Sequence, residues 1–314
     1  MKYTPTLSLV LSFSSLSAII SILALGCTVR AADASKILFI GNSFTYGAGS
    51  AVQFYRTDSV TDLNDDGRGG VPALFKAFTQ QAGLEFEVFH DLIPGSGLDK
   101  HLAEKKEILS QHWDIVNMHG YSTLDKSSPG DPSTLIWSAK DMAQLLFDQN
   151  PDVSIYLEAT WSRADQTYPE DGHWHGNPIH VMAKDIRAGY NKAAASNPAI
   201  LGVIPVGEAW NRAFVMGVAD SNPYDGISYG QVDLWTNDHY HGGTYGYYLA
   251  ALMIFGEVTG YDPRSLGEEE RAAFELGVSK EQAQALQEVA YQELQHETPH
   301  RNLKTFEPSP LPKQ

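Results

Sequence analysis

The stretch Lys36-Ile-Leu-Phe-Ile-Gly-Asn-Ser-Phe-Thr-Tyr46 decides the fold of this chain. Its four apolar residues, Ile37 to Ile40, have the continuous hydrophobic pattern of a buried parallel strand. Gly41 and Asn42 end this run, so Ser43 follows the carboxyl end of the strand. In open α/β sheets, ligands bind at that end of the strands. The Ser43 hydroxyl is therefore a candidate nucleophile, provided that a base lies beside it.

The base for this serine is expected far downstream, in a stretch rich in histidine and glycine. There Asp238 and His241 lie three positions apart, just before an apolar helical segment. Residues at i and i+3 lie side by side, so the carboxylate can hold one imidazole nitrogen while the other faces Ser43. The chain order of such triads is free. His239 is a rival base, but it points elsewhere if Asp238 faces His241.

Two motifs in this order resemble the first and last blocks of the SGNH (GDSL-like) hydrolases. They are Gly41-Asn-Ser-Phe-Thr45 after the first strand and Asp238-x-x-His241 near the end. The Gly-Asn-Ser form is similar to a bacterial exported subgroup, whose further phrases resemble 160–163, 204–210 and 238–260. The resemblance covers residues 35–262 and implies a flavodoxin-like three-layer α/β sandwich with a central five-stranded parallel sheet. It also implies a serine esterase with Ser43, Asp238 and His241 as its triad and no cofactor.

The resemblance implies an oxyanion hole as well. Its donors would be the backbone N–H of Ser43 and a glycine N–H at the end of the second strand, where spacing favours Gly95 over Gly97. Most of the family carries an asparagine after the third strand, and Ser122 takes that position here, with His119 just before it. Either side chain can donate a hydrogen bond, but neither is the expected amide. Loss of one such donor costs about 10²–10³ in rate, so an esterase that lacks it is slower but still possible. The identity of the third donor therefore stays open.

Residues at the next strand end are candidates for binding the substrate. Trp161 and Arg163 follow a strand expected at 153–159, and His119 lies at the neighbouring strand end. An aromatic face and a guanidinium suit a sugar ring or an acyl carboxylate. Core packing of Trp161 and an ion pair at Arg163 are equally good interpretations. The expected substrate is an acetyl or other short acyl ester on a carbohydrate, and a short-chain lipid ester and a thioester are the alternatives.

Two other functions stay open at this point. One is a glycan-binding protein of the same fold with impaired catalysis, which the missing asparagine motivates. The other is a metal-dependent hydrolase that uses His173 and His175, because a His-x-His pair can chelate a metal. The sequence fixes no third ligand for that pair, and Trp174 and Pro178 favour a packed surface loop.

The loop from 46 to 70 is longer than the 2–6 residues typical of a βα loop, so it is expected to wall the substrate site. It contains half of a calcium loop, with oxygen ligands at Asp62, Asn64 and Asp66 and the turn glycine at Gly67. The twelfth position, which needs a bidentate acid, is Ala73. A plain polar turn is therefore the competing interpretation.

The two ends of the chain are predicted to lie outside the hydrolase-like domain, residues 32–300. Residues 1–31 have the charge, apolar run and small-residue end of a secretory signal peptide, so export to the periplasm or beyond is expected. An uncleaved membrane anchor and lipidation at Cys27, in a lipobox-like Leu23-Ala-Leu-Gly-Cys27, are the alternatives. Residues 301–314 contain three prolines and are predicted to be a disordered tail.

The amino-acid composition limits the kinds of ligand and partner that the chain can bind. Cys27 is the single cysteine, so the domain after it can form neither a disulfide nor a thiolate metal site. The formal charge of −16 becomes −18 without residues 1–31, because that segment holds Lys2 and Arg30 and no acid. Such a surface repels phosphate backbones, which makes nucleic acid an unsuitable partner.

Overall fold

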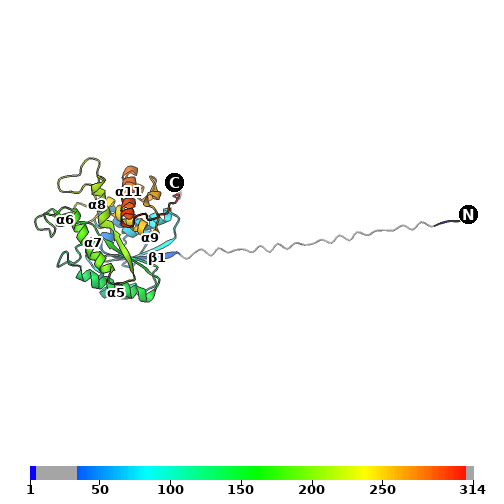
Figure 1. The fold of residues 1–314 in the computed structure, drawn as a ribbon, viewed down its shortest axis with the longest axis horizontal. Helices are drawn as coiled ribbons and strands as arrows, with labels where there is room; N and C mark the ends of the chain where they lie inside the picture. Colours follow the sequence, from blue (N-terminus) through cyan, green and yellow to red (C-terminus); the bar gives the residue numbers. More distant parts are fainter. Residues whose placement is uncertain (5–33, 309–314) are drawn as a thin grey trace. The chain divides into compact units, whose positions relative to one another are not determined.

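Six parallel strands form one sheet in the computed structural model, which describes residues 1–4 and 34–308 (Figure 1). The strands are β1 (Ser35–Gly41), β2 (Thr61–Asp62), β3 (Phe86–Leu92), β4 (Ile115–Met118), β5 (Ser154–Ala159) and β6 (Ile200–Pro205). Their order in the sheet is β2-β3-β1-β4-β5-β6. Without β2, this is the 2-1-3-4-5 order of flavodoxin-like sheets.

The prediction of five strands is wrong by one, because β2 adds a strand at the edge of the sheet. It lies inside the long loop after Ser43 and pairs Thr61 with Phe89 and Asp62 with His90. A strand of two residues is too short to show the alternation of apolar and polar residues that identifies a strand, so its sequence resembles a polar loop. The five strands that the sequence predicts are all present.

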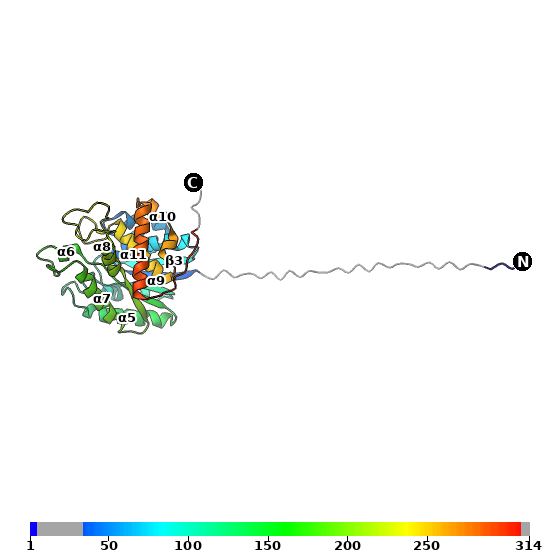
Figure 2. The same cartoon turned by 45° about the horizontal axis from the view of Figure 1, so that its top comes forward.

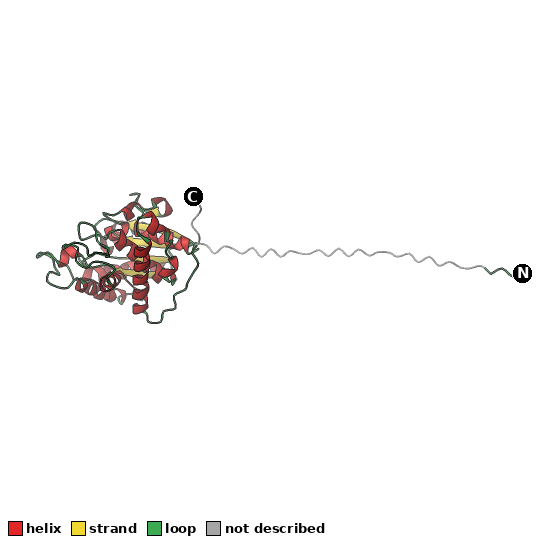
Figure 3. Cartoon of the chain, turned by 90° about the horizontal axis from the view of Figure 1, so that it is seen from above, coloured by secondary structure: helices red, strands yellow, loops and turns green. Residues whose placement is uncertain are grey.

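Helices cover both faces of the sheet, and the strands lie between them in a three-layer arrangement (Figure 3). Side chains of β1 alternate between the faces. Ile37 and Phe39 pack toward α2 (Gly70–Gln81) and α9 (Thr244–Thr259), and Leu38 and Ile40 pack toward α5 (Ser133–Gln149) and α7 (His180–Ala194). The helices are α1 (Ser43–Tyr46), α2 (Gly70–Gln81), α3 (Leu98–Glu104), α4 (Lys106–Leu109), α5 (Ser133–Gln149), α6 (Ala164–Thr167), α7 (His180–Ala194), α8 (Val206–Val215), α9 (Thr244–Thr259), α10 (Arg271–Glu275) and α11 (Lys280–Glu297). Within the described residues there are also the short 3₁₀ helices η1 (Ala51–Phe54), η2 (Thr57–Ser59) and η3 (Pro263–Leu266).

Helix α9 is buried on all sides from Gly246 to Gly256. The amphipathic helix α11 packs on α9 (Figure 2). Gly256 allows this close approach, because a Cβ atom there would overlap the side chain of Leu294. The C-terminal helix thus closes the core from outside as a further layer.

The chain continues in ordered contact beyond α11. Lys304 pairs in a parallel bridge with Tyr261, and the Phe306 ring lies 5.4 Å from the Tyr261 ring and 6.2 Å from the Phe255 ring, between centroids. Residues 301–308 therefore belong to the domain, and the tail predicted from 301 does not begin there.

The segment that holds the expected signal peptide and Cys27 falls almost wholly within residues 5–33, outside the described residues. Within the described part of the chain, no helix has the length and apolar character needed to cross a membrane.

Candidate active site

The candidate nucleophile sits where β1 turns into α1. Asn42 caps the helix, because its Oδ1 accepts a hydrogen bond of 3.0 Å from the backbone N–H of Phe44. Ser43 is the first residue of α1 and is 5% exposed. Within the described chain, the Ser43 N–H has no backbone acceptor, as is usual for the first N–H groups of a helix. A free N–H beside the hydroxyl is what an oxyanion requires.

The side-chain amide of Asn42 joins three strand ends. Its Nδ2 donates to the carbonyl oxygens of Ser96, at 2.8 Å, and Gly120, at 3.2 Å, which follow β3 and β4. The sequence suggested no role for Asn42. A polar residue directly before a serine at a strand end was the signal that could have indicated one, since buried amides there must find partners.

Asp238 and His241 form the hydrogen bond that their spacing predicts. His241 Nδ1 lies 2.6 Å from Asp238 Oδ2. Asp238 Oδ1 accepts three more bonds, from Thr236 Oγ1 at 2.6 Å and from the N–H groups of Tyr240 and His241 at 2.9 Å. Partial burial alone would raise the pKa of Asp238, but these donors outweigh it and hold the pKa well below its usual range. The carboxylate is thus a fixed negative charge behind the imidazole.

The other nitrogen of His241, Nε2, is buried and has no hydrogen-bond partner among the described residues. An unpaired ring nitrogen opposite a carboxylate is the arrangement of a general base that waits for a substrate-side proton. His239 does not share this position. Its backbone has a positive φ of 56°, and its ring packs 4.2 Å from the ring of Tyr224. Its Nδ1 is also buried without a partner among the described residues, but Asp238 bonds His241 instead.

Contacts between α1 and the Asp238 loop bring the two halves of the candidate triad together. The Phe44 ring lies 5.7 Å from the His241 ring and 5.3 Å from the Tyr240 ring, between centroids. Tyr247 of α9 donates to the carbonyl oxygen of Ser43 at 3.1 Å. No hydrogen bond joins Ser43 Oγ to His241 Nε2 within residues 34–308, and such bonds are often long before substrate binds.

Both candidate glycines lie just after β3, as predicted. Gly95 has φ 63° and is exposed, with open space where a side chain would be. Gly97 is the N-cap of α3 and faces the ring of Tyr121, where any Cβ atom would overlap the ring. Asn42 holds the carbonyl of Ser96 between them, so this loop is fixed relative to Ser43. The exposed Gly95 is the better placed of the two to offer its N–H to a ligand.

His119 and Trp161, predicted to contact substrate, are interior residues. His119 accepts from Thr45 Oγ1 through Nε2 at 2.7 Å and donates from Nδ1 to the Gly120 carbonyl at 2.9 Å, and burial lowers its pKa to about 4. Trp161 is 0% exposed and stacks between Phe44, at 4.3 Å, and Trp210, at 4.6 Å. Trp161 therefore packs in the core, as one of the two interpretations of its sequence position held, because no face of its ring reaches the crevice.

Arg163 connects the ends of β4 and β5 with the triad loop. Its guanidinium lies 3.6 Å from the ring centroid of Tyr240 and donates from Nη1 to Ser122 Oγ at 3.3 Å. The other nitrogens bind both carboxylate oxygens of Asp165, at 3.0 and 2.6 Å. The positive charge is therefore matched by a carboxylate, and the ion-pair interpretation of Arg163 is confirmed alongside its place beside Ser122.

The residues proposed for metal binding are engaged in other contacts. His173 packs against Trp174 at 4.6 Å, and His175 Nδ1 lies 3.0 Å from the carbonyl oxygen of Tyr168. Neither belongs to a group of three metal-ligating side chains within the described residues. In the calcium-like loop, the Asp62 carboxylate accepts from the N–H groups of Asn64, Asp66 and Arg68 at 2.9–3.2 Å. With these bonds, the calcium-like loop forms a polar turn at the end of β2.

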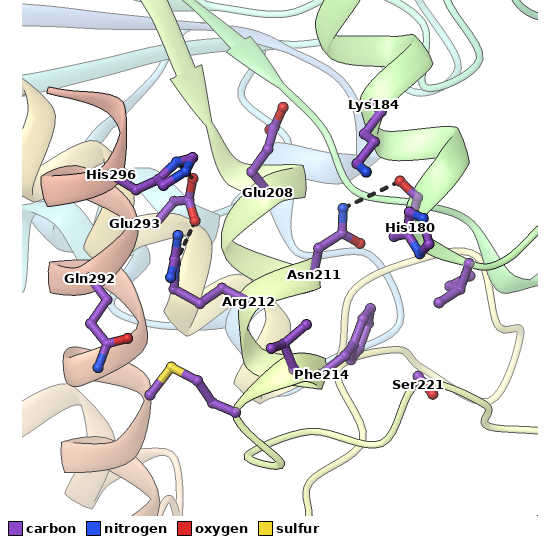
Figure 4. Close-up of a pocket in the computed structure, with 13 residues that line it drawn as sticks. His180, Lys184, Glu208, Asn211, Arg212, Phe214, Ser221, Gln292, Glu293 and His296 are labelled. Atoms are coloured by element: carbon purple, nitrogen blue, oxygen red, sulfur yellow. Dashed lines mark hydrogen bonds and ion pairs between the residues drawn. The ribbon is translucent and has the colours of Figure 1, made fainter. Parts of the chain in front are cut away.

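A pocket of about 750 Å³ lies between α7, α8 and α11 (Figure 4), and no triad residue lines it. Arg212 binds Glu293 at 2.6 Å, and Arg187 binds Glu297 at 2.6 Å. Glu293, Glu297 and the exposed His296 form the one group of potential metal ligands in the described chain, but both carboxylates already hold an arginine. The contacts fit a structural ion-pair network.

No protein-family model matches the chain, and no curated protein matches it. Among solved structures, a DUF4886 family protein from Bacteroides uniformis is similar over 87% of this chain and 100% of its own, with a TM-score of 0.58 and 18% identity. A protein from Parabacteroides merdae described as a GDSL-like lipase matches 72% of this chain and 96% of its own, with a TM-score of 0.51 and 18% identity. At such identities, the likeness shows a shared α/β fold.

Proposed function

We propose that this chain is a serine esterase that removes an acetyl or other short acyl group from a carbohydrate through an acyl-enzyme. The observation that carries the proposal is the bond between Asp238 and His241 Nδ1, which leaves His241 Nε2 unpaired within the described chain, in a ring that contacts Phe44, the residue after Ser43. The resemblance to SGNH hydrolases and the likeness in fold to a GDSL-like lipase support it.

In the proposed reaction, Ser43 Oγ attacks the ester carbonyl carbon and passes its proton to His241 Nε2. The carbonyl oxygen becomes an oxyanion that accepts from the N–H groups of Ser43 and Gly95. The bond to the leaving alcohol then breaks, and the alcohol takes the proton from His241. Water repeats the attack on the acyl-serine, which releases the acid and restores Ser43. Asp238 holds the imidazole in the tautomer that accepts at Nε2.

Ser122 is the third oxyanion donor in this proposal. Its Oγ accepts from Arg163, so its own hydroxyl hydrogen is free to be donated. His119 has no such freedom, because Thr45 and the Gly120 carbonyl occupy both ring nitrogens. Arg163 would thus affect the reaction indirectly, because it holds the Ser122 hydroxyl and the Tyr240 ring in place.

A row of aromatic residues beside the triad loop supports a carbohydrate substrate. Tyr224 is 46% exposed and lies 4.2 Å from the ring of His239 and 5.7 Å from that of Tyr168. Burial and the charges of Asp165 and Asp171 raise its pKa, which places carboxylates near the ring. A flat aromatic face with acceptors around it suits a sugar ring with its hydroxyl donors, and the negative charge disfavours anionic substrates.

The test of the reaction is hydrolysis of p-nitrophenyl acetate by the chain from Ala32, beside Ser43→Ala and His241→Ala. We expect both variants to lose at least about 10³ in kcat, with labelling of Ser43 by an organophosphonate in the parent. Activity that survives in Ser43→Ala would rule out the triad, and loss of activity on chelation would favour a metal site such as His173 and His175. A parent that neither hydrolyses nor labels would favour the glycan-binding alternative.

The test of the substrate class compares two exposed tyrosines of one loop. We expect Tyr224→Ala to lower kcat/KM on an acetylated neutral oligosaccharide about tenfold, because a stacking contact of about 1 kcal/mol is lost. Its activity on p-nitrophenyl acetate should stay at the parental value. Tyr229→Ala is the control and should change neither, since Tyr229 is fully exposed and makes no ring contact among the described residues. The proposal includes export, on the strength of the expected signal peptide.

A further inference from the structure

A second Ser-His-Asp arrangement lies directly behind the candidate nucleophile. Ser96 Oγ is 3.0 Å from His101 Nε2, and His101 Nδ1 is 2.6 Å from Asp91 Oδ2. These distances equal those of a catalytic triad. All three residues, however, are at most 1% exposed, so no ester can reach the Ser96 hydroxyl. The arrangement needs an explanation other than catalysis.

The hydrogen-bond acceptors around His101 define its role. Nδ1 faces the Asp91 carboxylate, and Nε2 faces the Gly41 carbonyl oxygen at 2.9 Å as well as Ser96 Oγ. The Ser96 hydroxyl is itself directed to the Ile93 carbonyl at 2.8 Å. Both ring nitrogens therefore donate, which corresponds to the imidazolium form. Burial alone would raise the pKa of Asp91, but the hydrogen bond and charge of His101 lower it, as expected of a buried ion pair.

Besides Asp91, the partners of His101 are Gly41 and Ser96, which lie in the two segments that carry the proposed oxyanion hole. Gly41 is two residues before Ser43, and its carbonyl also accepts from the N–H of Ile93 at 3.0 Å. Ser96 follows Gly95 directly, and its carbonyl accepts from the Asn42 amide. His101 thus joins the end of β1 to the loop after β3, and these two segments hold the N–H groups of Ser43 and Gly95.

The other end of the pair reaches the inserted strand. Asn64 Nδ2 donates to Asp91 Oδ1 at 2.8 Å, and Asn64 Oδ1 accepts from the N–H of Leu92 at 2.8 Å. Asn64 lies two residues after the end of β2, so the edge of the sheet supports the same pair. The chain of contacts runs from β2 through Asp91 and His101 to Gly41.

We propose that His101, held by Asp91, is a positioning residue that sets the spacing between the N–H groups of Ser43 and Gly95. The inference rests on the proposed esterase function. A fixed spacing matters because the transition state is stabilised only by donors that already point at the oxyanion. A misplacement of about 1 Å can cost about 10² in rate.

The experiment compares His101→Gln, Asp91→Asn and the parent with p-nitrophenyl acetate and with an organophosphonate. Glutamine cannot donate to Gly41 and Asp91 at once, so we expect kcat and the labelling rate of Ser43 to fall about 10- to 100-fold with KM nearly constant. In Asp91→Asn, the amide can donate to Nδ1 while Nε2–H still donates to Gly41, so at least about a third of the parental kcat should remain. His112→Gln, at an exposed histidine, is the control.

Two results would overturn the inference. One is a folded His101→Gln protein with parental kcat, and the other is a phosphonate label on Ser96 found by mass spectrometry. If His101→Gln does not fold, Asn64→Ala tests the same chain of contacts from its far end and should lower kcat at constant KM; parental kcat there would also contradict the inference. Failure of the proposed function looks different, because then Ser43 of the parent itself would not be labelled.

Discussion

The phenol oxygen of Tyr247 lies 3.1 Å from the carbonyl oxygen of Ser43 and 3.3 Å from that of Ala48. Helix α9, which follows the Asp238 loop, thereby holds the backbone of the candidate nucleophile. Tyr247 is fully buried, so this bond has no competitor in water.

Tyr247→Phe removes that donor and keeps the ring. Two buried carbonyl groups lose a partner, so the free energy of unfolding should fall by about 1–3 kcal/mol. The rate of phosphonate labelling at Ser43 should fall about tenfold, because the turn that carries the hydroxyl is less well fixed. Denaturant unfolding and labelling kinetics measure the two effects. Tyr245→Phe serves as control, since its hydroxyl binds Gln282 on α11. Unchanged labelling in Tyr247→Phe would show that the contact is not needed.

Asp238→Asn should lower kcat about 10²–10⁴-fold, because a neutral amide neither fixes the tautomer of His241 nor balances its charge. The folded pKa of Asp238 is depressed, so its contribution to stability is present above the unfolded pKa of about 3.9. That contribution is lost as the pH falls toward the lower folded pKa. The variant should therefore be less stable than the parent at pH 7, and the difference should shrink on acidification. Thermal unfolding at several pH values checks this, and a difference independent of pH would contradict it.

Glu158 is a buried carboxyl group in β5, 1% exposed, with Oε2 bound to Asn117 at 2.8 Å. Burial raises its pKa to about 7. Between pH 4.5 and 7, the unfolded chain releases this proton while the folded chain keeps it, so the parent loses stability as the pH rises. Glu158→Gln should remove that loss and be more stable than the parent at pH 8 by at most about 3 kcal/mol.

The measurement is denaturant unfolding of Glu158→Gln and the parent at pH 4.5 and pH 8. The two proteins should differ little at the lower pH and clearly at the higher one. Glu87→Gln, at an exposed position of β3, is the control and should show no such dependence. An equal effect at both pH values would mean that Glu158 is charged in the folded protein throughout.

Arg163→Lys keeps the charge but loses the two-point contact with Asp165 and the stacking on Tyr240. We expect kcat/KM to fall about tenfold, because lysine cannot reproduce a planar guanidinium between two partners. Steady-state kinetics on p-nitrophenyl acetate measure the effect. Arg187→Lys, in the ion-pair network of α7, is the matched control and should leave kcat/KM unchanged. A parental value for Arg163→Lys would mean that the ion pair of Arg163 is structural and does not affect the reaction.

The features that the sequence predicts well are those with a local pattern. The apolar run before Gly41 indicates a buried strand, and the i, i+3 spacing indicates the bond between Asp238 and His241. Both features depend on residues that are close together in the sequence, so they can be predicted without knowing how distant segments pack. Strand β2 has only two residues and gives no such pattern.

Other features depend on contacts between distant segments. The position of Trp161 after a strand correctly predicts that it lies at the carboxyl edge of the sheet. It does not predict the direction in which the ring points. Helices α1 and α8 supply Phe44 and Trp210, and the ring is buried between them. Asn42 acquires its role in the same way, because the carbonyl groups that it binds come from two other loops. No spacing in the sequence contains that information.

Strand β2 also has a consequence for the behaviour of the protein in concentrated solution. An uncovered edge strand is a template on which another chain can extend the sheet. Here β2 pairs with only two residues of β3, but side chains occupy much of what remains. Lys76 binds the carbonyl of Phe86, Arg68 binds that of Leu92, and Asn64 binds the N–H of Leu92. A second molecule would find few free backbone groups on the part of β3 that β2 leaves uncovered. We therefore expect this part of the edge to resist intermolecular β-pairing and the aggregation that follows from it.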